Sequence, residues 1–216
     1  MSYIDLVKYY ESCFQKYGDN NRGVDWPNEQ DAKKRYQIML DVVKYDSINE
    51  KKDNVSILDF GCGLAHLYGY MINNNVKYKY LGMDMSNEFI KKCKDKYPAI
   101  DFFQCDILKE RENYNECCDY ICINGVFTEK REMKYEEMLS YFKFMIKRLF
   151  NMCNRGISFN VMSKDVDWER DDLFHLPMSE LSDFLTKQVS RNFVIRNDYG
   201  LYEYTTYVYK KSNKEV

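Results

Sequence analysis

The chain has 216 residues, of which 45% are hydrophobic, 16% aromatic and 31% charged, and its formal net charge is -2. This length suits one domain with a sizeable core, and the hydrophobic fraction excludes a disordered chain. The near balance of charge gives no basic excess of the kind that binds nucleic acid, and no apolar run approaches the roughly 20 residues of a membrane span. We therefore expect neither a nucleic-acid nor a membrane partner.

The N-terminal segment, residues 1–50, is predicted to be helical and polar. Tyr3, Leu6, Val7 and Tyr10 form one apolar stripe at helical spacing, and a second stripe comprises Tyr36, Met39, Leu40 and Val43. Residues 18–27 between them are rich in Gly, Asn and Asp, which predicts a loop. A segment this short cannot form its own core, so we expect a helical lid packed on a domain of residues 51–216.

From residue 55 short apolar runs alternate with helical patterns. Strands are predicted at residues 55–60, 78–84, 100–104, 120–124 and 156–162, and helices at about 64–73, 86–97, 138–150 and 181–185. Such alternation implies right-handed βαβ units and a parallel sheet covered on both faces. The last two strand-like runs, 193–197 and 202–209, are joined by too few residues for a crossover, so they must be antiparallel. The predicted fold class is α/β, mostly parallel with an antiparallel C-terminal strand.

Eight cysteines and two histidines do not follow the spacing of a metal or disulfide framework. No Cys-x-x-Cys pair occurs, and His66 and His175 lie far apart in the sequence. Most of the cysteines sit inside apolar runs, and the N-terminus lacks the apolar stretch of an export signal. We expect reduced thiols, no metal site and a cytoplasmic location.

The turn after the first strand, Gly61-Cys62-Gly63, carries the clearest chemical signal. Glycines at a strand-to-helix turn let a ligand approach the main chain. Asp84 ends the second strand, where a carboxylate can accept hydrogen bonds from a ribose diol, and Asn124 ends the fourth, at the ligand crevice of a parallel sheet. Both S-adenosylmethionine (SAM) and a dinucleotide suit this layout, but the dinucleotide fingerprint needs a third glycine where this chain has His66.

Two motifs of the chain resemble motifs I and II of class I SAM-dependent methyltransferases: Asp59-Phe60-Gly61-Cys62-Gly63 and Gly82-Met83-Asp84-Met85-Ser86. Ala65 stands in place of a third motif-I glycine. Gln104-Cys105-Asp106-Ile107 resembles the segment whose acid meets the adenine amino group, and the terminal hairpin is similar to the last two strands of the family's Rossmann-like sheet. The resemblance covers about residues 55–210 and implies SAM as the cofactor.

A narrower resemblance extends over nearly the whole chain. Gly23-Val24-Asp25-Trp26, Asn124-Gly125-Val126-Phe127 and residues 198–205 are similar to segments of small bacterial methyltransferases found with surface-polysaccharide and capsule genes, including those of the O-methyl phosphoramidate decoration. This resemblance implies O-methylation of a small polar acceptor, either a phosphoramidate or a nucleotide-activated sugar.

The resemblance also assigns roles at the cofactor. Gly61 and Gly63 would approach its amino-acid part, Asp84 would hold the ribose and Met85 would pack on adenine. Arg35 suits a bidentate pair with the methionine carboxylate, within an N-terminal segment that closes over the cofactor. The full expected cofactor set is Trp26, Arg35, Asp59, Gly61, Gly63, Asp84, Met85, Asp106, Ile107 and Asn124.

The acceptor side is expected to follow the fifth strand and the terminal hairpin. The candidate acceptor-binding residues are Asn160, Lys164, Arg170, Tyr199 and Tyr202. His175 is the candidate general base for a hydroxyl acceptor. A phosphate-type oxygen is already anionic and needs no base, so Lys164 or Arg170 would then orient the anion.

Two other functions stay open on the sequence alone. One is a non-catalytic SAM-binding partner of another methyltransferase, and the other is an NAD-dependent oxidoreductase. Nucleic-acid amino-methyltransferases usually carry an Asn/Asp-Pro-Pro-aromatic run after the fourth strand, whereas this chain reads Asn124-Gly125-Val126-Phe127. The sequence does not indicate an oligomeric state.

Overall fold

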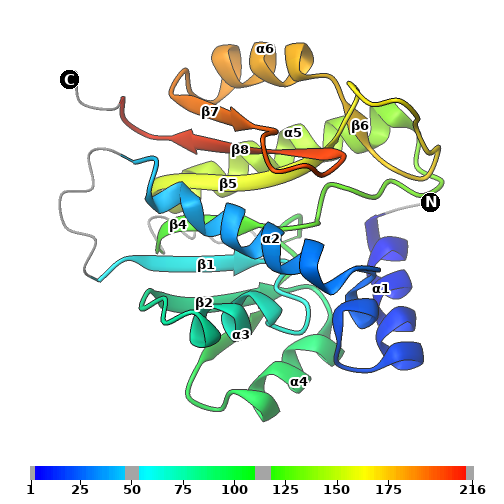
Figure 1. Ribbon diagram of the computed structural model, residues 1–216, viewed down its shortest axis with the longest axis vertical. Coiled ribbons are helices and arrows are strands. Elements are labelled where there is room, and N and C mark those ends of the chain that lie inside the picture. Colours follow the sequence, from blue (N-terminus) through cyan, green and yellow to red (C-terminus); the bar gives the residue numbers. More distant parts are fainter. Residues whose placement is uncertain (1–2, 47–53, 110–117, 213–216) are drawn as a thin grey trace.

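The computed structural model describes residues 3–46, 54–109 and 118–212. The expected boundary between residues 50 and 51, and Cys117, lie outside these residues. Figure 1 shows a single sheet with helices on both of its faces. Its strands are β1 (Ser56–Phe60), β2 (Lys79–Asp84), β3 (Asp101–Gln104), β4 (Cys118–Ile123), β5 (Cys153–Ser163), β6 (His175–Leu176), β7 (Phe193–Arg196) and β8 (Glu203–Tyr209).

The strand order is β3-β2-β1-β4-β5-β8-β7, and β6 pairs with β5 off this path. Strands β1 to β5 pair in parallel, whereas β8 runs antiparallel to both β5 and β7. The predicted α/β class and antiparallel C-terminal strand are therefore confirmed. The two-residue β6 was not predicted, because a strand that short has no periodicity to detect.

The helices are α1 (Tyr3–Tyr17), α2 (Glu29–Leu40), α3 (His66–Asn73), α4 (Asn87–Lys96), α5 (Tyr135–Met152) and α6 (Met178–Gln188), with two 3₁₀ turns, η1 (Asn21–Val24) and η2 (Asp41–Val43). Side chains cap two helices: Asn28 accepts from the backbone of Gln30 and Asp31, and Ser86 accepts from Phe89. Ser86 is thus the N-cap of α4. No helix in the described part of the chain is long and apolar enough to cross a bilayer.

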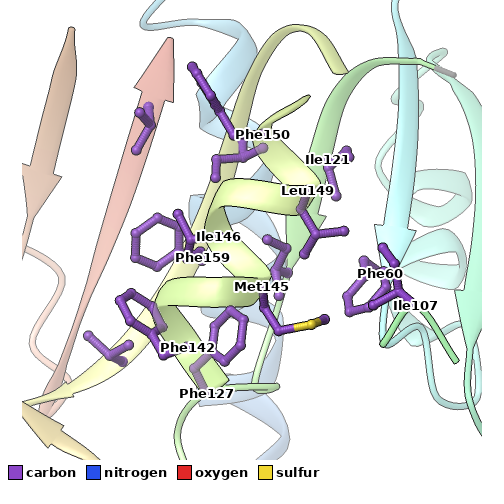
Figure 2. Packing of buried hydrophobic residues seen from close by; sticks show 14 of the residues in the cluster. Phe60, Ile107, Ile121, Phe127, Phe142, Met145, Ile146, Leu149, Phe150 and Phe159 are labelled. Atoms are coloured by element: carbon purple, nitrogen blue, oxygen red, sulfur yellow. The ribbon is translucent and has the colours of Figure 1, made fainter. Parts of the chain in front are cut away.

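Two hydrophobic clusters cover the two faces of the sheet. On one face α5 packs its apolar stripe on β4 and β5, and Figure 2 shows Phe142 between the rings of Phe127 and Phe159, whose centroids lie 5.0 and 5.5 Å away. On the other face α2, α3 and α4 bury residues such as Met39 and Leu67. Helices on both faces leave the carboxyl ends of the parallel strands as the place for a ligand crevice.

Helix α1 lies at that end of the sheet. In Figure 1 it stands beside the edge toward which the β1 arrow points. The rings of Phe14 and Phe89 meet edge to face at 5.8 Å, which joins α1 to α4, and Tyr3 stacks on Tyr141 of α5 at 5.9 Å. The N-terminal helix therefore contacts elements from both faces of the sheet.

Candidate active site

A cavity opens at the carboxyl ends of β1, β2 and β4. Its walls come from the glycine loop after β1, from α1, from the segment before α2 and from the loop after β4. Seven of the ten expected cofactor residues line it: Trp26, Asp59, Gly61, Gly63, Asp84, Met85 and Asn124.

The glycine loop has a backbone conformation that leaves no room for a side chain at Gly61. Gly61 has φ of 72°, and a Cβ atom there would lie 2.4 Å from Val126 Cγ2, too close for any side chain. The backbone amides of Gly61 and Cys62 both donate to the Met83 carbonyl, at 2.8 and 3.0 Å, which fixes the loop against β2. Ala65 also adopts a left-handed conformation, with φ of 56°, where an L-residue costs about 1–2 kcal/mol.

Asp84 reaches across from the end of β2 to the same loop. Its carboxylate accepts from the backbone amides of Gly63, at 2.9 Å, and Ser86, at 2.8 Å. Burial raises the pKa of Asp84, while these amides favour its charged form. The side chain is therefore held in one orientation at the cavity wall, as a ribose ligand requires.

Asp59 and Asn124 supply acceptors at the floor of the cavity. The Tyr80 hydroxyl donates to Asp59 at 2.7 Å, and burial raises the pKa of this carboxyl to about 7. The side-chain oxygen of Asn124 is buried and has no hydrogen-bond partner among the described residues. An unpaired carbonyl oxygen and a carboxylate suit the ammonium and sulfonium charges of SAM, so the residues present fit this cofactor.

His66 provides the one basic side chain in the described lining of the cavity. Its Nε2 lies 2.8 Å from Asp19 Oδ1, and Lys96 also contacts Asp19, at 3.0 Å. The hydrogen bond from His66 holds the pKa of Asp19 at about 2. These contacts tie the segment between α1 and η1 to the start of α3.

Several lining residues were not predicted as ligands. All four residues of the first apolar stripe, Tyr3, Leu6, Val7 and Tyr10, face the cavity from α1. The sequence identified this stripe as an apolar face but not what it covers. Glu129, in the loop after β4, also lines the cavity. Its position five residues beyond Asn124 was the only signal for it.

Arg35, the expected ligand of the methionine carboxylate, has other partners in the structure. Its Nε donates to Glu203 Oε2 at 2.8 Å, its guanidinium lies 4.2 Å from the centroid of the Trp26 ring, and it is not part of the cavity wall. The reason is that Glu203 is only 1% exposed and needs a cation.

Asp106 and Ile107 also lie outside the lining. The Tyr3 hydroxyl donates to Asp106 Oδ2 at 3.2 Å, and Lys109 Nζ lies 3.1 Å from the same oxygen. Ile107 is buried in the hydrophobic core beneath α5.

None of the residues expected on the acceptor side lines the cavity. His175 is buried and both ring nitrogens are used: Nδ1 lies 2.6 Å from the Ser163 carbonyl, and Nε2 accepts from the Arg170 amide at 3.3 Å. It cannot serve as a base while it holds these bonds. Asn160 is likewise internal, accepting from the Gly125 amide and donating to Glu203, at 2.8 and 2.9 Å.

The other four candidates have partners away from the cavity. Lys164 pairs with Glu169 at 2.5 Å and Arg170 with Asp172, all at the surface. The Tyr199 hydroxyl lies 2.9 Å from that of Thr205, and the exposed Tyr202 ring packs on Trp168. These four side chains therefore have partners within the protein and do not line the cavity.

Comparison with known proteins agrees with the fold and the cavity. A model of the "Methyltransferase domain" family matches residues 51–187. The chain is 30% identical over 164 residues to "Putative methyltransferase Rv1506c" of Mycobacterium tuberculosis (strain ATCC 25618 / H37Rv), covering 74% of this chain and 96% of that protein.

Solved structures of similar fold include magnesium protoporphyrin IX methyltransferase from Synechocystis PCC 6803 with bound SAM. Its TM-score is 0.63 at 14% identity, with 98% of both chains covered. Another is 1,6-didemethyltoxoflavin-N1-methyltransferase from Burkholderia thailandensis with bound 1,6-didemethyltoxoflavin and S-adenosylhomocysteine (SAH). Its TM-score is 0.63 at 13% identity, with 98% of this chain and 92% of that one covered. At these identities the likeness concerns the fold alone.

A Rossmann-like sheet with a glycine loop and an acid at the end of β2 defines the class of nucleoside-cofactor enzymes. Within that class the chain belongs to the methyltransferase domain family, and it is a SAM-dependent methyltransferase. Its cofactor is SAM. In the described residues no group of three or more His, Cys, Asp or Glu side chains could hold a metal ion.

Proposed function

We propose that this enzyme methylates a hydroxyl oxygen of a small acceptor of the kind carried by surface-polysaccharide precursors, such as a nucleotide-activated sugar. The observation that carries the proposal is the charge of the cavity wall. Asp59, Asp84 and Glu129 are its acidic side chains, and no Lys or Arg belongs to the lining among the residues that the structure describes. Because burial raises the pKa of Asp59 and of Glu129 to about 7, these two carboxyls are partly ionised at neutral pH. Such a wall attracts the positive cofactor and repels an anionic oxygen at the reacting position, so the diphosphate of a nucleotide-activated sugar is expected to lie outside this cavity.

The same observation disfavours a phosphoramidate, the other acceptor that the narrower resemblance suggests. An anionic oxygen needs a cation to orient it, and arginine is the usual choice. Lys164 and Arg170 were the candidates, but Glu169 and Asp172 already neutralise them outside the cavity. A neutral hydroxyl needs no such cation.

The main role of the protein in this reaction is to align the acceptor with the methyl group of SAM. SAM supplies a methyl group that its sulfonium charge already activates. The protein must hold the acceptor oxygen in line with the bond that breaks and must keep water away. The aromatic rings of Tyr10, Trp26 and Tyr141 line the cavity and are suited to pack against a sugar ring while shielding the site.

We also propose that the N-terminal segment, which the structure describes over residues 3–46, acts as a lid and forms part of the active-site wall. The support is that α1 contributes its whole apolar stripe to the cavity and that Val24 and Trp26 extend the same wall. A segment that supplies this many contacts must be in place for the cofactor to bind tightly.

The experiment is a methyl-transfer screen with isotopically labelled SAM and a panel of nucleotide-activated sugars and phosphoramidates, read by mass spectrometry. We expect a product methylated on a sugar hydroxyl and unmodified phosphoramidates. Methylation of phosphoramidates alone would refute the proposal. SAH binding without methylation of any panel member would instead favour a non-catalytic SAM-binding partner.

A further inference from the structure

Glu129 is a partly buried carboxylate that no cofactor motif accounts for. It lies in the loop after β4, its side chain is 13% exposed, and it lines the same cavity as Asp84 and Asn124. The loop is anchored on both sides of it: Glu129 forms an antiparallel bridge with Leu173, and Thr128 accepts from the Phe174 amide at 2.8 Å. The carboxylate is therefore presented to the cavity from a fixed backbone.

The charge near Glu129 is only partly compensated. Arg131 Nε lies 2.7 Å from Glu129 Oε2, yet this oxygen has no aligned hydrogen bond among the described residues. Arg131 also contacts Asp25 and Asp172, both at 3.5 Å, and its guanidinium lies 3.5 Å from the Tyr9 ring centroid. One guanidinium thus serves three carboxylates, and Glu129 keeps capacity to bind a proton or a cation.

The groups around Glu129 favour its neutral form on balance. Burial raises the pKa of this carboxyl to about 7, with Asp25 and Asp172 adding to the effect and Arg131 and Arg170 opposing it. From α1, Tyr10 and Cys13 also face it, and each has a raised pKa. A carboxylate with a pKa close to the working pH can both take up and release a proton.

We propose that the Glu129 carboxylate faces the point of methyl transfer and accepts the proton of the acceptor hydroxyl. This rests on the proposed function. The acceptor oxygen forms the new bond to carbon, the bond between sulfur and that methyl carbon breaks, and its electron pair stays on sulfur to give SAH. The hydroxyl proton passes to Glu129 and from there to water.

The first test needs no identified acceptor. Sinefungin carries a carbon with a primary amine where SAM has the sulfonium sulfur and its methyl group, so its ammonium probes the transfer point. Calorimetry would compare sinefungin with SAH for wild type, for Glu129→Gln and for Glu132→Gln. Glu132 is an exposed residue of the same loop and lies outside this cavity, so it is a matched control.

We expect sinefungin to bind more tightly than SAH in the wild type, and this preference to fall at least tenfold in Glu129→Gln. SAH affinity itself should change less than threefold, and Glu132→Gln should behave as the wild type. Between pH 6 and 8 the wild type's preference for sinefungin over SAH should increase, because Glu129 loses its proton in this range. In Glu129→Gln this increase should be smaller, since Asp59 is then the remaining carboxyl with a pKa of about 7.

An unchanged sinefungin preference in folded Glu129→Gln overturns the inference, whereas a failure of SAH to bind the wild type would overturn the cofactor site itself. If Glu129→Gln does not fold, Glu129→Asp keeps the charge but withdraws it by one methylene, and an intermediate preference is expected. With a sugar hydroxyl acceptor from the panel, turnover of Glu129→Gln should fall about 10²–10⁴-fold. Turnover within threefold of the wild type would also overturn the inference.

Discussion

Arg35 donates from its Nε to Glu203 Oε2 across 2.8 Å, and this buried pair joins α2 to β8. The other carboxylate oxygen of Glu203 accepts from Asn160, which in turn accepts from the amide of Gly125 in the cavity wall. Trp26 closes the arrangement, because it packs on Arg35 and a Cβ atom at Gly125 would lie 2.7 Å from its ring. Arg35, Asn160 and Glu203 lie outside the cavity lining. They therefore act on the site through Trp26 and Gly125, which form part of the cavity wall.

Arg35→Ala should lower the free energy of unfolding by about 3–5 kcal/mol, because it leaves the Glu203 carboxylate buried without a cation. Urea denaturation measures this. Lys33→Ala is the control, since Lys33 pairs with Glu29 on the exposed side of the same helix and should cost less than about 1 kcal/mol. Normal stability of Arg35→Ala together with a loss of SAH affinity would contradict this and would support Arg35 as a ligand of the cofactor.

His175→Ala should affect stability and not cofactor binding. The substitution leaves the Ser163 carbonyl and the Arg170 amide unpaired and opens a small cavity, with a cost of about 2–4 kcal/mol. Thermal unfolding and SAH calorimetry on the same preparation separate the two effects. A loss of turnover of about a hundredfold with stability intact would contradict this and restore His175 as a base.

Asp59 should make the stability of the protein fall as pH rises from about 4 to 7. Burial raises its folded pKa to about 7, so the folded state holds a proton that the unfolded chain has already released, and the stabilisation is lost through this window. Asp59→Asn should remove about 2–4 kcal/mol of this dependence. Denaturation at pH 5 and pH 8 measures it, and an equal difference in both proteins would contradict the assignment. In Asp59→Asn, the raised pKa of Glu129 should still make the free energy of unfolding fall somewhat as pH rises.

Removal of the first 17 residues should weaken SAH binding at least tenfold, since α1 ends at Tyr17 and its apolar stripe forms one cavity wall. The clusters that α2 and α5 form with the sheet lie largely outside α1, so a native circular dichroism spectrum is expected. Normal SAH affinity in the shortened, folded protein would show that α1 is not part of the site.

The features whose positions were predicted correctly from the sequence are local ones. The glycine loop, Asp84 and Asn124 each lie at the end of a strand, where a strand–turn–helix pattern is readable within a few residues. Arg35 and Glu203 stand 168 positions apart, and nothing near either residue signals their pairing. His175 looked like a base because histidines are rare here, but its environment depends on β5 and β6 pairing. The α1 stripe was visible as a pattern, whereas its function depended on where the helix docks.

The most direct measurement of the cofactor site is calorimetry with SAH on wild type, Asp84→Asn and Asp95→Asn, with NAD⁺ as a second ligand. Asp84 accepts from the glycine loop at 2.9 Å and should hold the ribose, whereas Asp95 is an exposed residue of α4. We expect wild type and Asp95→Asn to bind SAH equally and not NAD⁺. Asp84→Asn should lose about 1.5–3 kcal/mol of SAH binding, the range for hydrogen bonds to a charged group. Equal SAH affinity in all three proteins, or tighter binding of NAD⁺ than of SAH, would contradict the assignment of this cavity to SAM.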